Sequence, residues 1–217
     1  MELLLYNEVN IPAGNVTLEG TLFIPLNAKA IVIFSHGSGS SRFSKRNEFV
    51  AEYLNERNIG TLLFDLLTRA EDEHYYDRFD IELQTQRLVD ATEWLEKIPA
   101  AKDCRIGYFG ASTGAATALK AAAILPDIHA VVSRGGRPDL AGSDLHKVTA
   151  PTLLIVGSHD QDILKLNEDA IKQLPCEKEL EIVAGASHLF EEHGSMEKVC
   201  ELAAAWFEKY LIPATVS

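Results

Sequence analysis

Serine, aspartate and histidine occur in this chain in an order that suits nucleophilic catalysis. Ser112 lies in the segment Gly110-Ala-Ser112-Thr-Gly114, between an apolar run at 105–109 and an alanine-rich run at 115–124. The spacing Gly-x-Ser-x-Gly is typical of a nucleophile elbow, a sharp strand-to-helix turn that lifts a serine hydroxyl above a sheet. Glycine suits the two flanking positions because a Cβ there would crowd the turn. The sequence therefore predicts a reactive serine at 112.

A serine hydroxyl is a weak nucleophile at neutral pH, so it needs a base and a carboxylate that orients the base. Asp160 and then His188 follow Ser112 along the chain, each just after an apolar run. Serine, acid and histidine in this chain order are typical of enzymes that carry the elbow motif. We therefore predict a Ser112–Asp160–His188 triad.

Other residues compete for two of these roles. Asp160 could simply cap the helix that follows it, and Asp162 is a second candidate for the acid. His159 is expected to point away from Asp160, because neighbouring side chains diverge. His193 lies in an acidic run that suits a solvated loop, and His36 is expected to brace the loop after its strand. His188 itself could be an ordinary loop histidine.

An acyl-transfer site also needs two N–H donors for the oxyanion. One is expected from Thr113, the residue after the nucleophile, and the other from Ser38 in the loop after an apolar strand. Gly37 and Gly39 would let that backbone approach a substrate closely. The same glycine- and serine-rich loop could suggest phosphate binding, but it lacks the lysine and spacing of a phosphate-binding loop.

The elements that must position these residues alternate between strand and helix. Continuous apolar runs indicate strands buried on both faces, which is typical of a parallel sheet covered by helices. Strands are predicted at 30–34, 61–64, 105–109, 129–133, 151–156 and 179–183. Helices are predicted at 44–57, 81–98, 115–124, 163–173 and 195–211. The fold class is therefore α/β, with a doubly wound, mostly parallel sheet whose working site lies at the carboxyl ends of the strands.

The remaining segments refine this fold. An antiparallel hairpin is expected from strands at 2–9 and 16–24, joined by a loop at 11–15. Residues 66–79 read as a charged loop that rims the pocket, with Leu67, Tyr75, Tyr76 and Phe79 facing it. No segment is long enough for a large lid domain, and residues 1–217 are expected to form one domain.

Composition limits the possible partners. The 217 residues are 47% hydrophobic and 24% charged, with a net charge of −12, which suits a soluble globular protein. Such an acidic chain is a poor partner for nucleic acid or an anionic membrane. Three cysteines without metal-type spacing favour the reducing cytoplasm and predict no metal site. Neither a signal peptide nor a membrane span is expected.

Four segments carry a resemblance to a known family: Ser35–Arg42, Leu63–Thr68, Gly107–Gly114 and Gly185–Phe190. The chain resembles the α/β-hydrolase superfamily over nearly its whole length, and within it the small, capless dienelactone-hydrolase-like group. The four segments are similar to bacterial members sometimes joined to a phosphoribosyltransferase domain. The resemblance implies the Ser112–Asp160–His188 triad. Dienelactone hydrolase itself has a cysteine nucleophile where this chain has Ser112, so lactone specificity is not implied.

The expected function is cleavage of a small carboxylic ester or thioester through an acyl-enzyme, without metal or organic cofactor. A second reading is a ligand-binding protein that keeps the fold with little turnover, since fold does not dictate function. A third keeps the triad but performs other chemistry, such as peptide hydrolysis, C–C cleavage or perhydrolysis. Labelling of Ser112 and substrate profiling would separate these readings. The sequence does not indicate the oligomeric state.

Overall fold

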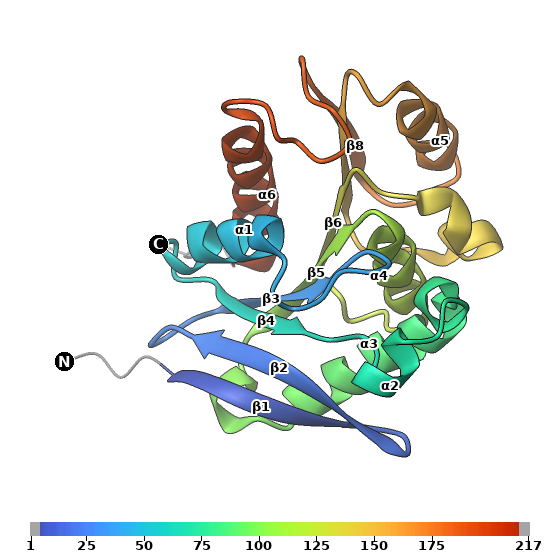
Figure 1. The fold of residues 1–217 in the computed structure, drawn as a ribbon. Helices are drawn as coiled ribbons and strands as arrows, with labels where there is room; N and C mark the ends of the chain where they lie inside the picture. Colours follow the sequence, from blue (N-terminus) through green and yellow to red (C-terminus); the bar gives the residue numbers. More distant parts are fainter. Residues whose placement is uncertain (1–4, 213–217) are drawn as a thin grey trace.

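A twisted sheet runs through the centre of the computed structural model, which describes residues 5–212 (Figure 1). The sheet has eight strands in the order β1-β2-β4-β3-β5-β6-β7-β8. The strands are β1 Leu5–Ala13, β2 Val16–Ile24, β3 Ala30–Ser35, β4 Gly60–Phe64, β5 Arg105–Ala111, β6 Ala130–Arg134, β7 Thr152–Gly157 and β8 Lys178–Val183. Strands β3 to β8 pair in parallel, whereas β1 pairs with β2 and β2 with β4 antiparallel. The predicted fold class is confirmed.

Helices cover both faces of the sheet (Figure 1). One apolar layer joins the sheet to α1 and α6, and the other joins it to α3 and α4. All residues of β3 and β4 are buried, as expected for strands enclosed by two helical layers. The helices are α1 Lys45–Asn55, α2 Arg69–Asp72, α3 Ile81–Leu95, α4 Thr113–Ile124, α5 Gln161–Ile171 and α6 Ser195–Leu211, with short 3₁₀ segments at Asp77–Phe79, Pro99–Ala101 and Pro138–Lys147.

The N-terminal hairpin differs from the prediction in its turn. β1 continues to Ala13, and the turn is only Gly14 and Asn15, so the predicted loop at 11–15 was too long. The prediction ended the first strand before Pro12, because proline has no backbone N–H to donate to a neighbouring strand. β1 is an edge strand that pairs only with β2 in the described chain, and an edge tolerates proline. Residues 2–4 of the predicted first strand lie outside the described residues.

Segment 66–79 is more ordered than a loop. It contains α2, which begins with a capping box in which Thr68 and Glu71 exchange hydrogen bonds, and the 3₁₀ turn at Asp77–Phe79. The pattern was hidden because α2 is a single turn, too short to show helical periodicity. The 3₁₀ segment Pro138–Lys147 was also missed. Gly142, with φ +56°, divides it into two stretches that are too short to show helical periodicity.

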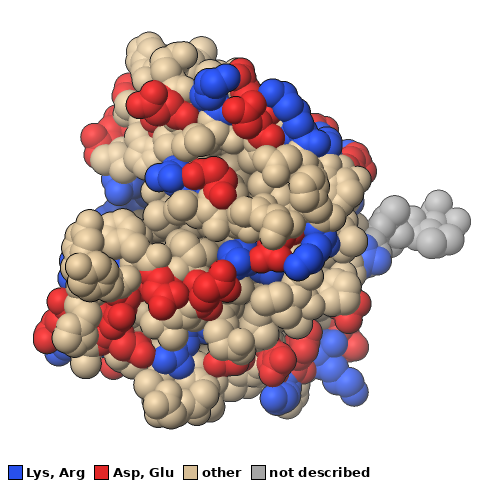
Figure 2. Space-filling model, turned by 90° about the vertical axis from the view of Figure 1, so that its right-hand side faces the viewer, with Lys and Arg blue, Asp and Glu red and all other residues tan. Residues whose placement is uncertain are grey.

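Charged side chains of both signs are interspersed over the face shown in Figure 2. Some form ion pairs between elements, such as Lys120 Nζ on α4 with Asp144 Oδ2 at 2.7 Å. Within residues 5–212, none of the helices combines the length and apolarity that spanning a membrane requires.

Candidate active site

Ser112 sits in a strained turn between β5 and α4. Its backbone has φ 52° and ψ −122°, a region that non-glycine residues rarely occupy. The two flanking positions have no room for a side chain. A Cβ at Gly110 would lie 2.5 Å from Cα of Ala115, and a Cβ at Gly114 would lie 2.2 Å from the carbonyl oxygen of Ser35. The strand–turn–helix context predicted for the elbow is confirmed.

The loop after β6 holds this strained backbone in place. The Ser112 N–H donates to the carbonyl oxygen of Arg134 at 3.2 Å, and the Ser112 carbonyl accepts from the N–H of Arg137 at 3.0 Å. Two hydrogen bonds from a neighbouring element can maintain a conformation that the local sequence disfavours. The hydroxyl is therefore presented by a fixed turn at the carboxyl edge of the sheet.

Asp160 and His188 are joined by a hydrogen bond. His188 Nδ1 lies 2.6 Å from Asp160 Oδ2, and the carboxylate is the more buried partner, with 14% of its side chain exposed against 37% for the imidazole. Their loops touch because Gly157 lacks a side chain: a Cβ there would lie 2.3 Å from the carbonyl oxygen of Ala186. The loops after β7 and β8 thus meet as the parallel sheet predicts.

The competing residues lie elsewhere. Asp160 is the N-cap residue of α5, but its side chain makes no capping hydrogen bond. Asp162 is exposed in the first turn of α5, and His159 and His193 are exposed as well. In this geometry the carboxylate of Asp160 serves His188 rather than the helix end.

Ser112 and His188 line one cavity of about 460 Å³. Thr113 and Ser38 line it too, so four of the five predicted site residues share its wall, and Asp160 lies behind His188. Of the residues expected to rim the pocket, only Phe79 does so. Tyr75 and Tyr76 are largely exposed, and Leu67 lines a different cavity, beside His36 and Arg42.

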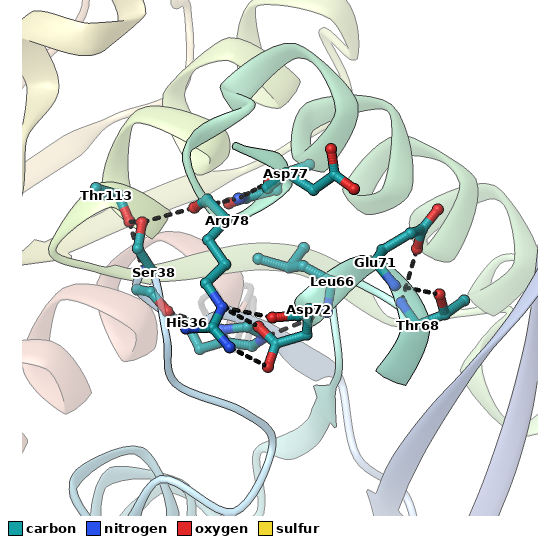
Figure 3. A network of polar contacts seen from close by, with 11 residues as sticks. His36, Ser38, Leu66, Thr68, Glu71, Asp72, Asp77, Arg78 and Thr113 are labelled. Carbon is teal, nitrogen blue, oxygen red and sulfur yellow. Dashed lines mark hydrogen bonds and ion pairs between the residues drawn. The ribbon is translucent and has the colours of Figure 1, made fainter. Parts of the chain in front are cut away.

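The expected oxyanion donors are linked to each other (Figure 3). The Ser38 N–H donates to Thr113 Oγ1 at 2.8 Å, and the Ser38 hydroxyl donates to the carbonyl oxygen of Arg78 at 2.7 Å. Thr113 begins α4, where the first N–H groups have no partner within the helix. A substrate oxygen would therefore meet the Thr113 N–H directly, but would have to share the Ser38 N–H with the threonine hydroxyl.

His36 braces the loop after its strand, as the sequence predicted, and also holds the loop after β4, which was not predicted. Its Nδ1 lies 3.0 Å from the carbonyl oxygen of Gly37, and its Nε2 accepts the N–H of Leu66 at 3.1 Å (Figure 3). These partners require a neutral ring with the proton on Nδ1. Burial is the main cause that lowers the pKa of His36, against opposing effects of its hydrogen bond to Gly37 and of Asp65 and Asp72.

This lowered pKa predicts a pH-dependent contribution to stability. In the unfolded chain the ring titrates near 6.5, so below that pH the unfolded state binds the extra proton and the free energy of unfolding falls. We expect the His36→Asn variant to lose less stability than wild type between neutral and mildly acidic pH. At neutral pH it should be destabilised by about 1–3 kcal/mol, because the buried Leu66 N–H loses its acceptor.

Urea unfolding midpoints across this pH range would check the prediction. His159→Asn, which removes an exposed histidine from a loop, serves as the control. Parallel pH profiles for wild type and His36→Asn would show that His36 does not carry the effect.

Three arginines of the cavity, Arg46, Arg134 and Arg137, were not among the predicted site residues. Arg134 ends β6 and Arg46 lies in α1, and both line the cavity beside Ser112. A signal for Arg134 was present, because it directly follows an apolar strand whose carboxyl end faces the site. Arg46 had none, since one arginine in an amphipathic helix is usually on a solvated face. No cluster of three His, Cys, Asp or Glu side chains suited to a metal occurs in the part of the chain that the structure describes.

The strand order and the elbow together define the α/β-hydrolase fold. The model of the dienelactone hydrolase family matches residues 18–211, and the chain belongs to that family. Solved structures that share this fold include proteins named as hydrolases.

Individual relatives extend this picture. A dienelactone hydrolase from Anabaena variabilis is 52% identical, with a TM-score of 0.92 over 96% of this chain and 99% of that one. Est1E from Butyrivibrio proteoclasticus shares the fold at 18% identity, with a TM-score of 0.79 over 93% of this chain and 98% of that one. A Mycobacterium tuberculosis protein named "Putative phosphoribosyl transferase" is 52% identical over 205 residues, which are 94% of this chain and 46% of that protein. The chain thus spans about half the length of the curated relatives it matches.

Proposed function

We propose that this protein is a serine hydrolase that cleaves a small carboxylic ester or thioester through an acyl-enzyme. Membership of the dienelactone hydrolase family supports hydrolysis in general. The observation that carries the finer proposal is the hydrogen bond of 2.6 Å between Asp160 and His188, at the edge of the cavity that Ser112 lines. A buried carboxylate on a histidine beside an elbow serine is the arrangement that activates a hydroxyl.

The reaction begins with attack of the Ser112 hydroxyl oxygen on the acyl carbon. His188 takes the hydroxyl proton on Nε2, the ring nitrogen that its bond to Asp160 leaves available. Asp160 holds the Nδ1–H tautomer and stabilises the imidazolium that forms. The Thr113 N–H binds the developing oxyanion, and the Ser38 N–H joins it by turning from the Thr113 hydroxyl.

The second half of the reaction releases the acid. The imidazolium protonates the leaving alcohol or thiol, and the neutral ring then takes a proton from water. The hydroxide formed attacks the acyl-enzyme, and collapse of the second tetrahedral intermediate returns the proton to Ser112. The cavity is small and no lid domain covers it within residues 5–212, so we propose substrates with short acyl chains.

Changing Asp160 to asparagine tests this proposal. Asparagine keeps the shape of the side chain but favours the wrong histidine tautomer and removes the charge that stabilises the imidazolium. We expect kcat for p-nitrophenyl acetate to fall by about 10³-fold or more. The matched control is Asp162→Asn, two residues further on and exposed, which should keep near wild-type kcat.

If both asparagine variants keep wild-type rates, Asp160 is not the acid of the triad. If wild type itself turns over none of a panel of esters, thioesters and lactones, the protein is better described as a ligand-binding member of the family.

We also propose a cytoplasmic location. Cys104, Cys176 and Cys200 are all free thiols, which fits a reducing compartment.

A further inference from the structure

The guanidinium of Arg134 is buried without a counter-ion. Only 5% of the residue is exposed, and its buried Nε has no hydrogen-bond partner among the described residues. Other buried cations among the described residues are paired: Arg87 bonds Glu71, and Lys120 bonds Asp144. A buried charge without a partner is unfavourable, so an unpaired one at a cavity wall favours binding of an anion there.

An aromatic ring and a second cation lie near the Arg134 side chain. Its guanidinium carbon lies 5.9 Å from the ring centre of Phe190. Burial, followed by the charge of Arg46, lowers the pKa of Arg134 to about 10, so the side chain remains charged at neutral pH. Arg46 has a buried Nε without a partner as well, and its ion pair with Glu191 is long, at 3.6 Å. Arg137, in the same cavity, is already neutralised by two hydrogen bonds to Asp139.

The backbone fixes this charge relative to the nucleophile. The carbonyl oxygen of Arg134 accepts the N–H of Ser112, so the two residues are direct neighbours across β5 and β6. Both residues line the same cavity, together with Arg46. A substrate small enough for this cavity can therefore place its acyl carbon at Ser112 and a second group at Arg134.

We propose that Arg134, assisted by Arg46, is a subsite for an anionic group of the substrate, a carboxylate or a phosphate. The protein would then prefer esters whose acyl or alcohol part carries a negative charge. This inference rests on the proposed function, because a substrate subsite presupposes a reaction. Binding of the anion itself does not require catalysis.

The first experiment measures binding without turnover. Succinate and inorganic phosphate are titrated by calorimetry into the Ser112→Ala variant, with and without Arg134→Gln. We expect at least one anion to bind and Arg134→Gln to weaken that binding by about 10-fold or more, as expected for loss of a charge-assisted hydrogen bond. Arg105→Gln removes a positive charge at the opposite edge of the sheet and should leave binding unchanged. The proposal is overturned if neither succinate nor phosphate binds, or if Arg105→Gln weakens anion binding as much as Arg134→Gln does.

The second experiment uses matched esters. Neutral p-nitrophenyl acetate is compared with mono-p-nitrophenyl succinate and with p-nitrophenyl phosphonoacetate, so the carboxylate and phosphate types are separated. Arg134→Gln should lower kcat/KM about 10- to 100-fold for the preferred charged ester and less than about 3-fold for the neutral one. Arg46→Gln should also lower kcat/KM more for the charged ester than for the neutral one. It provides a second test of the subsite in case the Arg134→Gln variant does not fold.

The outcomes separate the two proposals. Equal losses of kcat/KM on neutral and charged esters would refute the subsite while leaving the hydrolase proposal intact. Anion binding that depends on Arg134, in a protein that cleaves none of the esters, would keep the subsite and refute the proposed function.

Discussion

The Ser112→Ala variant is expected to lose at least about 10⁴-fold in kcat for ester hydrolysis, because the alanine has no oxygen to form the acyl-enzyme. The elbow itself should remain, since the hydrogen bonds that hold position 112 involve only its backbone N–H and carbonyl. The thermal unfolding midpoint should therefore stay near that of wild type while activity is lost. Initial rates with p-nitrophenyl acetate and a calorimetric melt measure the two quantities.

A serine-to-alanine substitution outside the site is the control for the loss of activity in Ser112→Ala. Ser143 is exposed in the 3₁₀ segment Pro138–Lys147, remote from the nucleophile in sequence and outside the cavity lining. Ser143→Ala should keep wild-type kcat. If Ser112→Ala also keeps it, the hydroxyl at 112 takes no part in the reaction.

The Gly114→Ala variant is expected to show the largest loss of stability among single substitutions at the elbow. The added Cβ would lie 2.2 Å from the carbonyl oxygen of Ser35 and 2.5 Å from that of His36. Both neighbours are backbone atoms of β3 and its loop, so relief requires α4 to move away from the sheet. We expect a loss of at least about 3 kcal/mol in the free energy of unfolding, together with loss of activity.

Gly194→Ala is the control for this steric argument. Gly194 has φ +79° and no atom within 4 Å of an added Cβ, so only the left-handed backbone conformation is penalised. A loss of about 1–2 kcal/mol is expected there. Urea unfolding of both variants gives the comparison, and similar losses would mean that the close contact with β3 is unimportant.

The central sheet and the elbow were predictable from sequence because they depend on strong local signals. The run 30–34 is apolar throughout and the run 61–64 is apolar except for Thr61, and in the structure both are buried on both faces, as β3 and β4. The last helix was predicted at 195–211 and lies at Ser195–Leu211. Long periodic segments and continuous apolar runs leave few alternatives.

Predictions failed where context overrides local pattern. In the helix predicted at 44–57, the spacing of Phe49, Val50 and Leu54 places them on one apolar face. Phe49 is nevertheless 39% exposed, while Asn47 is 2% exposed. Hydrophobicity alone could not reveal this, because the orientation of α1 is set by its packing on α6 and β4. Tyr75 and Tyr76 were expected at the pocket and instead face solvent, since the short helix α2 folds the segment back on itself.

The sequence singled out the residues of the candidate site but not its electrostatics. Chain order and loop position single out Asp160 and His188, and the structure joins them by a hydrogen bond. The occupied Ser38 amide and the unpaired Arg134 depend on contacts between residues far apart in the chain, and no spacing rule reports such contacts.

Covalent labelling of Ser112 is the most direct test of the proposed chemistry. A fluorophosphonate probe reacts with a serine only where a base has activated its hydroxyl, and peptide mass spectrometry then locates the adduct. The account predicts an adduct on Ser112 in wild type, none in Ser112→Ala, and strongly slowed labelling in His188→Ala. An unlabelled Ser112 in folded wild type, or labelling at the wild-type rate without His188, would contradict it.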